Sequence, residues 1–323
     1  MQLLRRLADI PADFGPTIVS VGNFDGLHRA HRKVIDIIVD RARQQGLKSM
    51  VVSFEPHPIR ILRPDSPFKL ITPTVEKIRM LSETGVDAAL FLPFTRDLSL
   101  MTPHQFAHDI LGKALRAKEV HEGYNFHFGH KAEGNVEMLA EFGRELGFRV
   151  ELYPEMRLRG ETVSSSHIRK LVSKGRLSRA RHLLARPFSI LSTAGRGHGR
   201  GTTHTVPTIN LSRYEELVPR HGVYITRARI ANECFDAVTN VGDRPTFGPD
   251  SFAIETHLLN FHPLEIDAET EVEIFFLDRI RDEIKFPSVE ALREQIGKDV
   301  NRARRYFHLM ASHASQSGKS LSV

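Results

Sequence analysis

The sequence predicts two domains of different fold class: a doubly wound α/β domain with a parallel sheet, then an antiparallel β-barrel followed by a helix. The chain has 323 residues, and domains average about 150 residues. In the first half, short apolar runs alternate with amphipathic helical segments; the second half has closely spaced runs of β-forming residues. We place the boundary between Arg186 and Pro187, which gives domains at residues 1–186 and 187–311.

The first domain opens with a strand–helix–strand unit, which implies a parallel sheet. Residues 17–21 predict a buried strand, 27–45 an amphipathic helix that ends at Gly46, and 49–54 the next strand. The alternation continues with helices near 75–84, 103–116 and 134–146, and strands near 87–92, 118–121 and 148–152. Residues 164–184 predict helix with an interruption near Gly175.

The second domain shows the pattern of an antiparallel barrel or sandwich. Strands are expected at 222–230, 235–241, 252–259 and 270–277, and a helix near 288–307. The tail from residue 312 to residue 323 is rich in serine and is expected to be disordered.

Composition limits the class of protein and its compartment. The net charge of +6 favours partners that carry phosphate, but the basic residues are dispersed, so no nucleic acid partner is expected. Cys234 is the one cysteine, which excludes a disulfide framework and fits a reducing cytoplasm. No apolar run approaches the roughly 20 residues of a membrane span, and the start lacks the apolar region of a signal peptide. We therefore expect a cytoplasmic protein without a membrane partner.

The segment 22–31, GNFDGLHRAH, joins the first strand to the first helix. Glycines permit a tight turn there, and the helix start offers backbone N–H groups and a positive dipole end to a phosphate. His28 and His31 lie three residues apart, so they share one face of the first turn and are candidates to stabilise phosphate charge. The alternative is a glycine turn with surface histidines; a zinc site is disfavoured because a third ligand is missing.

Four ordered motifs carry a family resemblance: 22–31, 53–58 (SFEPHP), 123–129 (GYNFHFG) and 163–169 (VSSSHIR). Together they resemble the bacterial bifunctional riboflavin kinase/FAD synthetases, whose first domain is of the HxGH nucleotidyltransferase type. The resemblance implies that an FMN phosphate oxygen attacks the α-phosphate of ATP, giving FAD and pyrophosphate.

The resemblance also implies roles for individual residues of the first domain. His28 and His31 would be catalytic, and Asn125 would lie against the flavin or its phosphate. The nucleotide and its phosphates would be bound by Gly22, Asn23, Phe24, Asp25, Gly26, Ser164, Ser165, Ser166 and Arg169. The serine cluster also suits a helix N-cap, and both roles are compatible.

The second domain carries a second constellation. Thr208 and Asn210 share one face of an expected strand, and their oxygens are hard ligands suited to Mg²⁺ shared with phosphates. This segment resembles the PTAN motif of flavokinases. Glu255, a partly buried strand carboxylate, is a candidate general base for the riboflavin 5′-hydroxyl, unless it simply points to solvent. Arg281 matches a family arginine at the flavin site, or is a surface salt-bridge residue.

Several positions depart from the family pattern. Ala30 replaces the glycine of HxGH, and His167 stands in the serine motif. In the loop before Asn210, Arg196 stands where the family has His, Thr202 where it has Arg, and Thr205 where it has Gly.

Three hypotheses therefore stay open. The first is a bifunctional enzyme with riboflavin, FMN and ATP as substrates, Mg²⁺ as cofactor and FAD as product. The second is an FMN adenylyltransferase with a degenerate kinase domain. The third is a non-catalytic flavin- or nucleic-acid-binding descendant. The sequence sets no oligomeric state.

Overall fold

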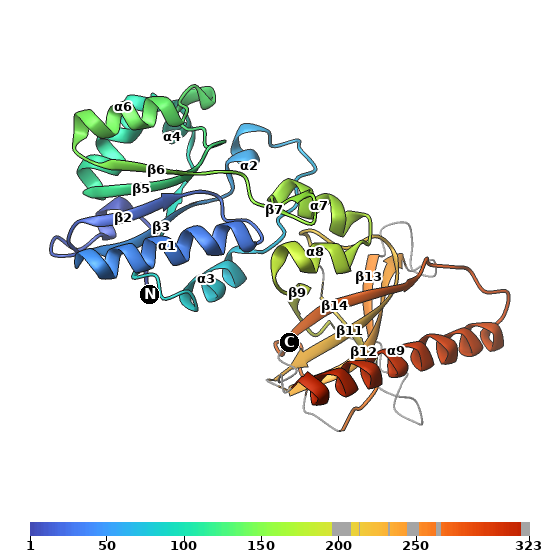
Figure 1. The fold of residues 1–323 in the computed structure, drawn as a ribbon. Coiled ribbons are helices and arrows are strands. Elements are labelled where there is room, and N and C mark those ends of the chain that lie inside the picture. Colours follow the sequence, from blue (N-terminus) through green and yellow to red (C-terminus); the bar gives the residue numbers. More distant parts are fainter. Residues whose placement is uncertain (196–207, 213, 232, 244–251, 263–265, 318–323) are drawn as a thin grey trace. The chain divides into compact units, whose positions relative to one another are not determined.

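The structure is a computed structural model that describes residues 1–195, 208–212, 214–231, 233–243, 252–262 and 266–317 (Figure 1). The chain folds into two compact units, residues 1–167 and residues 168–323. Each unit is described by itself.

Unit 1 is built on a six-stranded sheet in the order β1-β4-β3-β2-β5-β6, and its strand pairs are parallel. The strands are β1 (Gln2–Leu4), β2 (Thr17–Val21), β3 (Lys48–Glu55), β4 (Ala88–Pro93), β5 (Ala117–Gly123) and β6 (Arg149–Tyr153). The predicted doubly wound α/β fold is confirmed. The chain runs outward from β2 through β3 to β4, then crosses to β5, so the strand order reverses between β2 and β5.

Helices cover both faces of this sheet (Figure 1). Apolar residues of α1 (Arg29–Gln45) and α3 (Thr74–Ser82) pack on one face, and those of the π-helix η2 (Phe106–Ala114) and of α6 (Val136–Leu146) pack on the other. Shorter elements are η1 (Leu7–Asp9), α2 (Pro58–Leu62), α4 (Arg96–Leu100), α5 (Pro103–Gln105), η3 (His130–Ala132) and the β7–β8 ribbon (Arg157–Leu158, Glu161–Thr162).

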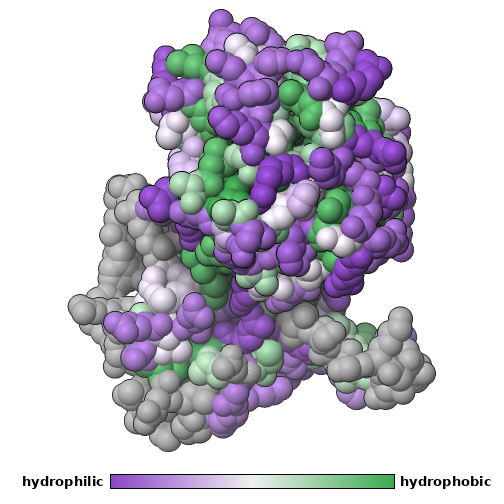
Figure 2. Space-filling model, turned by 90° about the vertical axis from the view of Figure 1, so that its left-hand side faces the viewer, coloured by the Kyte–Doolittle hydropathy of each residue, from purple (hydrophilic) through white to green (hydrophobic). Residues whose placement is uncertain are grey.

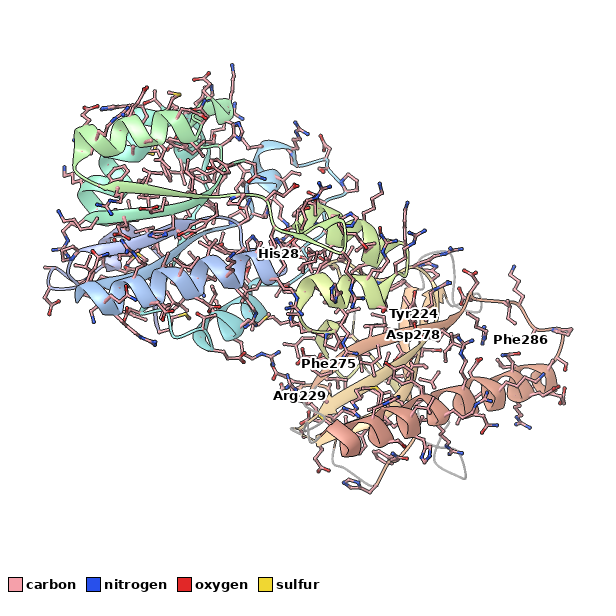
Figure 3. The ribbon with its side chains drawn as sticks, viewed as in Figure 1. His28, Tyr224, Arg229, Phe275, Asp278 and Phe286 are labelled. Carbon is pink, nitrogen blue, oxygen red and sulfur yellow. The ribbon has the colours of Figure 1, made fainter. Side chains whose placement is uncertain are left out.

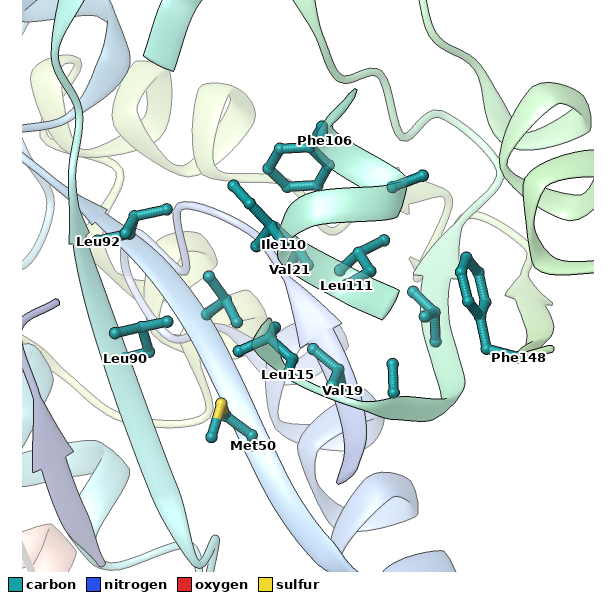
Figure 4. Packing of buried hydrophobic residues seen from close by; sticks show 14 of the residues in the cluster. Val19, Val21, Met50, Leu90, Leu92, Phe106, Ile110, Leu111, Leu115 and Phe148 are labelled. Atoms are coloured by element: carbon teal, nitrogen blue, oxygen red, sulfur yellow. The ribbon is translucent and has the colours of Figure 1, made fainter. Parts of the chain in front are cut away.

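The larger core of unit 1 lies between the sheet and η2. Figure 4 shows Val19, Met50 and Leu90 of three neighbouring strands beneath Phe106 and Ile110 of η2. All of these side chains are buried, as expected for strands covered on both faces. This core holds the carboxyl ends of the strands in fixed register, and the loops that follow those ends form the candidate site.

Unit 2 is an antiparallel sheet in the order β10-β13-β12-β11-β14-β9. Its strands are β9 (Phe188–Thr193), β10 (Thr208–Asn210), β11 (Gly222–Ile230), β12 (Glu233–Asp243), β13 (Phe252–Leu258) and β14 (Glu271–Arg281). A bridge between Ala194 and Leu211, and a 2.9 Å hydrogen bond from the Ser212 N–H to the Thr193 carbonyl, join the two edges of the sheet. The predicted barrel architecture is confirmed.

Helices pack on the barrel as well. α9 (Val289–Ser317) places Ala303 and Phe307 against Val223, Ile225 and neighbouring apolar residues. Residues 312–317, expected to be disordered, continue α9, and no glycine or proline lies between Gly297 and Gly318 to end the helix earlier. Residues 318–323 lie outside the described part of the chain.

Residues that precede the expected domain boundary also belong to the compact barrel unit. α7 (Ser165–Ser173) crosses the division between the units, and α8 (Leu177–Leu184) contacts β9 and β14. Leu177, Leu183 and Leu184 of α8 are buried.

On the face shown in Figure 2, hydrophobic residues are interspersed among hydrophilic ones. Among the described residues, no helix combines the length and apolar character that a membrane span requires.

Candidate active sites

The turn after β2 has an unusual backbone. Phe24, Gly26 and Leu27 all have positive φ angles, of 46°, 83° and 39°. Glycine adopts such angles freely, but phenylalanine and leucine rarely do, and strained backbone of this kind clusters at functional sites. The Gly22 N–H donates to the Val52 carbonyl at 2.9 Å, so the turn begins directly where β2 leaves the sheet.

His28 and His31 lie together at the N-terminus of α1. His28 is the N-cap residue, and its Nδ1 accepts a hydrogen bond from the His31 backbone N–H at 3.4 Å. The two imidazoles are stacked with centroids 3.6 Å apart. Because Nδ1 of His28 is an acceptor, its proton lies on Nε2 in the neutral ring. The predicted shared face of the two histidines is therefore present (His28 is labelled in Figure 3).

Burial sets the charge of His31. Burial lowers the pKa of His31 well below its ordinary value, and the nearby His28 and Lys77 lower it further. Within the described residues, Nδ1 of His31 is buried and has no hydrogen-bond partner. His31 is therefore neutral at neutral pH, and it offers a polar ring atom beside the helix start.

The predicted nucleotide-binding residues Asn23 and Asp25 differ in what they contact. The Asp25 carboxylate accepts from the backbone N–H groups of Ile71 and Thr72 at 3.0–3.1 Å and is buried. It fixes the turn to the segment before α3. The Asn23 side-chain oxygen is buried without a hydrogen-bond partner among the described residues, whereas its backbone carbonyl accepts from Ser53 at 3.2 Å.

Lys77 of α3 is a site residue that the sequence did not indicate. Its Nζ donates to the Asn23 carbonyl at 2.8 Å, and the residue is 1% exposed. Burial lowers the pKa of Lys77, while Asp25 and Glu55 act in the opposite direction. A lysine in an amphipathic helix ordinarily predicts a solvated face, so only the fold reveals this buried cation beneath the turn.

The serine cluster lies at the start of α7. Ser165 donates to the Asp25 carbonyl at 2.8 Å, which joins the cluster to the turn after β2. Ser164 accepts from the His167 N–H at 3.3 Å, as an N-cap does, and Ser166 is exposed. His167 pairs with Glu161 at 2.7 Å. Arg169 follows on the same helix.

Asn125 lies in the turn that follows β5, and it is exposed. The Phe126 N–H closes that turn on the Gly123 carbonyl at 2.9 Å. Phe128 is buried and Phe126 packs against the core, as expected for core aromatics.

In unit 2, strand register brings the second constellation together. Asn210 of β10 lies directly opposite Glu255 of β13, and Glu255 lies opposite Asn240 of β12. These three residues form one cross-strand row whose side chains share a face. The sequence predicted Asn210 and Glu255 but missed Asn240, because pairing between strands distant in sequence is not a local property.

A second row lies two residues along the same strands, where Thr208 is opposite His257. Thr208 is exposed, and Glu255 is half-buried. Burial lowers the pKa of His257, and the Arg304 charge on α9 lowers it further. His257 is thus a neutral imidazole beside the predicted metal ligand.

Arg281 forms a salt bridge, as in the second of the two roles considered for it. Its guanidinium binds the buried Asp299 carboxylate of α9 at 2.8–3.2 Å, and its Nη1 donates to the Asp282 carbonyl at 3.0 Å. The guanidinium also lies 5.7 Å from the Phe286 ring centre (labelled in Figure 3). This pair joins β14 to α9.

Other predicted parts of the second site fall outside the described residues. They are Arg196, Thr202 and Thr205 of the nucleotide loop. Across the ranges that are described, no three His, Cys, Asp or Glu side chains gather as metal ligands.

A stacked histidine pair at the carboxyl edge of a doubly wound sheet, followed by a barrel with an acid between two amides, is typical of a transferase with two sites for phosphate chemistry. The sequence pattern of the FAD synthetase family matches residues 10–167, and that of the riboflavin kinase family matches residues 184–307. This chain belongs to the family of bifunctional riboflavin kinase/FMN adenylyltransferases.

Two relatives of similar length carry the name of this family. The chain is 32% identical to the bifunctional riboflavin kinase/FMN adenylyltransferase of Escherichia coli K12, over 90% of this chain and 93% of that one. It is 33% identical to the enzyme of the same name from Listeria monocytogenes, over 90% and 92%. A crystal structure titled as a macrolide-efflux protein from Streptococcus pneumoniae is similar with a TM-score of 0.81 and 28% identity, over 94% and 98% of the two chains.

Proposed function

We propose that this protein phosphorylates riboflavin to FMN in unit 2 and adenylylates FMN to FAD in unit 1, with ATP as the donor in both steps. The membership in both families supports the two activities. Two observations carry the assignment of sites: the stacked histidine pair at the start of α1 in unit 1, and the Asn210–Glu255–Asn240 row in unit 2.

In unit 1, an oxygen of the FMN phosphate attacks the α-phosphorus of ATP, and the bond from that phosphorus to the bridging oxygen breaks to release pyrophosphate. Such transfers depend on positioning and on charge stabilisation. His28 donates from Nε2, and the first N–H groups of α1 add their dipole. Ser164, Ser165, Ser166 and Arg169 hold the leaving phosphates, and the turn of Gly22–Gly26 encloses the nucleotide.

In unit 2, Glu255 takes the proton from the riboflavin 5′-hydroxyl as that oxygen attacks the γ-phosphorus of ATP, and the bond from that phosphorus to the β,γ-bridging oxygen breaks to release ADP. Thr208 and Asn210 supply hard oxygen donors beside this carboxylate, which is the donor set that Mg²⁺ prefers. When bound there, Mg²⁺ neutralises charge on the phosphates of ATP. Asn240 lies opposite Glu255 on its other side.

Chromatography of the flavins formed from riboflavin, ATP and Mg²⁺ tests the proposal. FMN together with FAD is the expected result. FAD formed only from supplied FMN would leave unit 1 active and refute the kinase assignment. No product from either flavin would refute both assignments and favour a flavin-binding role.

The proposed substrates are small molecules, and the chemistry requires neither a nucleic acid nor a membrane. We place the enzyme in the cytoplasm, where ATP is available and where its exposed thiol, Cys234, stays reduced.

A further inference from the structure

The strands β2 and β5 separate before they end. Their pairing runs from Thr17 with Ala117 to Val19 with Val120, although β2 continues to Val21 and β5 to Gly123. On its other side β2 stays paired with β3 as far as Val21 with Val52. The gap therefore opens only at the carboxyl edge between β2 and β5. That is where the strand order reverses, and α/β sheets bind ligands at such a point.

Glu122 occupies this gap. One oxygen of its carboxyl accepts the Val21 N–H at 2.6 Å, in place of the missing strand pairing. The residue is 5% exposed. Val21 directly precedes the turn that leads to the histidine pair, and Glu122 directly precedes the turn that carries Asn125. One side chain therefore joins the bases of two loops of the proposed adenylyl-transfer site.

An ionised carboxylate in this place would oppose the phosphates that the site must hold. Burial raises the pKa of Glu122 well above its ordinary value, and the Val21 N–H only partly opposes this. Glu119 and His121 alternate to the opposite face of β5. Among the described residues, the ionisable groups at or in contact with the turn after β2 include His28 and His31 of α1, Lys77 of α3 and Asp25.

We propose that Glu122 is a positioning residue for adenylyl transfer. As a neutral acid it holds β2 and β5 together at the gap and allows the phosphates of FMN and ATP to bind. When it loses its proton, its negative charge prevents their binding. This inference rests on the proposed function of unit 1. It predicts a specific weakening of substrate binding in alkaline solution, since the FMN phosphate itself is already ionised at and above about pH 7.

The test is the KM for FMN of the full-length protein at saturating ATP and Mg²⁺, from about pH 7 to about pH 10. For a single ionisation that blocks binding, the KM rises by up to about tenfold for each pH unit above the pKa. We expect the wild-type KM to rise at least about tenfold over this range, with a smaller change in kcat. Glu122→Gln keeps the acceptor for Val21 but cannot ionise, so its KM should stay within about twofold.

Two controls separate the charge from the packing. Glu137→Gln removes an exposed carboxylate from the first turn of α6 and should keep the wild-type rise. Riboflavin phosphorylation, measured on the same proteins, should show the same pH profile in the wild type and in all variants.

A flat wild-type KM overturns the proposal, and so does a rise that persists in Glu122→Gln, which would assign the titration to Lys77 or another group. If Glu122→Gln does not fold, Glu122→Leu serves instead and should also show a flat KM, with a lower kcat. Absence of FAD at every pH would refute the proposed function of unit 1 itself, which is a different result.

Discussion

The two candidate sites are assembled in different ways. In unit 1 the turn, the helix cap and the histidine pair lie within ten consecutive residues, and burial keeps His31 neutral. In unit 2 the acid and its two amides come from three strands, β10, β13 and β12, and only antiparallel register makes them neighbours. The first site is therefore sensitive to local backbone chemistry, whereas the second depends on the integrity of the whole barrel.

The surroundings of the two sites differ as well. Around the first site, Asp25, Ser165 and Lys77 hold the turn through hydrogen bonds to backbone atoms. Within the described residues, Nδ1 of His31 keeps its hydrogen-bonding capacity for a ligand. The second site lies on β10, β13 and β12, and the predicted nucleotide loop that precedes it lies outside the described part of the chain.

The largest expected effect comes from removing the histidine pair. His28→Ala together with His31→Ala should lower the rate of FAD formation from FMN by about 10⁴-fold, since a single preorganised donor contributes about 10²–10³-fold. Riboflavin phosphorylation in the same protein is the control and should be unchanged. Near-normal FAD formation in the double variant would show that unit 1 does not use this pair.

A fragment comparison tests which residues the barrel needs. The sequence places the boundary after residue 186, whereas α8 buries Leu177, Leu183 and Leu184 in the compact unit that begins at residue 168. We expect residues 168–323 to be more stable than residues 187–323 by at least about 4.5 kcal/mol, because each of the three buried leucines contributes about 1.5–3 kcal/mol. Urea unfolding followed by circular dichroism measures the difference. Equal stability of the two fragments would favour the boundary at 186.

Replacing Glu255 should impair riboflavin phosphorylation and leave adenylyl transfer intact, which is the reverse of the effect expected for the histidine variant. Glu255→Gln should reduce kcat for riboflavin phosphorylation by about 10²–10³-fold, because a general base is lost while binding contacts remain. Adenylylation of supplied FMN should be unaffected. Glu271→Gln, an exposed strand carboxylate of β14, is the matched control and should behave as wild type. Loss of FAD synthesis from supplied FMN in Glu255→Gln would contradict the independence of the sites.

The free energy of unfolding of unit 1 should depend on pH through Glu119. Burial alone would raise its pKa, but hydrogen bonds from Arg41, Gln45 and His121 outweigh it and lower the pKa to about 2. The stabilisation is therefore present above about pH 4.5 and is lost as the pH falls toward about 2. It amounts to about 3 kcal/mol at 1.36 kcal/mol per unit. Glu119→Gln should remove most of this pH dependence of the free energy of unfolding, which urea unfolding at several pH values measures. An unchanged pH dependence in the variant would contradict the role of Glu119.

The smallest effect concerns the nucleotide loop of the kinase. Thr205→Gly with Thr202→Arg restores the family pattern and should lower the KM for ATP by several fold, with little change in kcat, because a loop that covers ATP acts mostly on binding. Steady-state kinetics of riboflavin phosphorylation measures both constants. If only the restored variant forms FMN at saturating ATP, the natural kinase site is inactive.

The sequence by itself determined the fold classes and the local part of the first site. Alternation of short apolar runs with amphipathic helical segments predicted the parallel sheet, and closely spaced runs of β-forming residues predicted the barrel strands, because both patterns are local properties of the chain. The GNFDGLHRAH segment predicted the turn and the paired histidines, since both features depend only on neighbours in the chain.

Tertiary structure alone decided which distant residues meet. Lys77 and Glu122 resemble ordinary surface charges in sequence, yet the sheet and its helices bury both at the proposed site. Asn240 joins Glu255 only through register, and Arg281 meets Asp299 only because α9 packs on the barrel. Contacts between distant segments, and the desolvation that shifts a pKa, arise from packing, which no local pattern encodes.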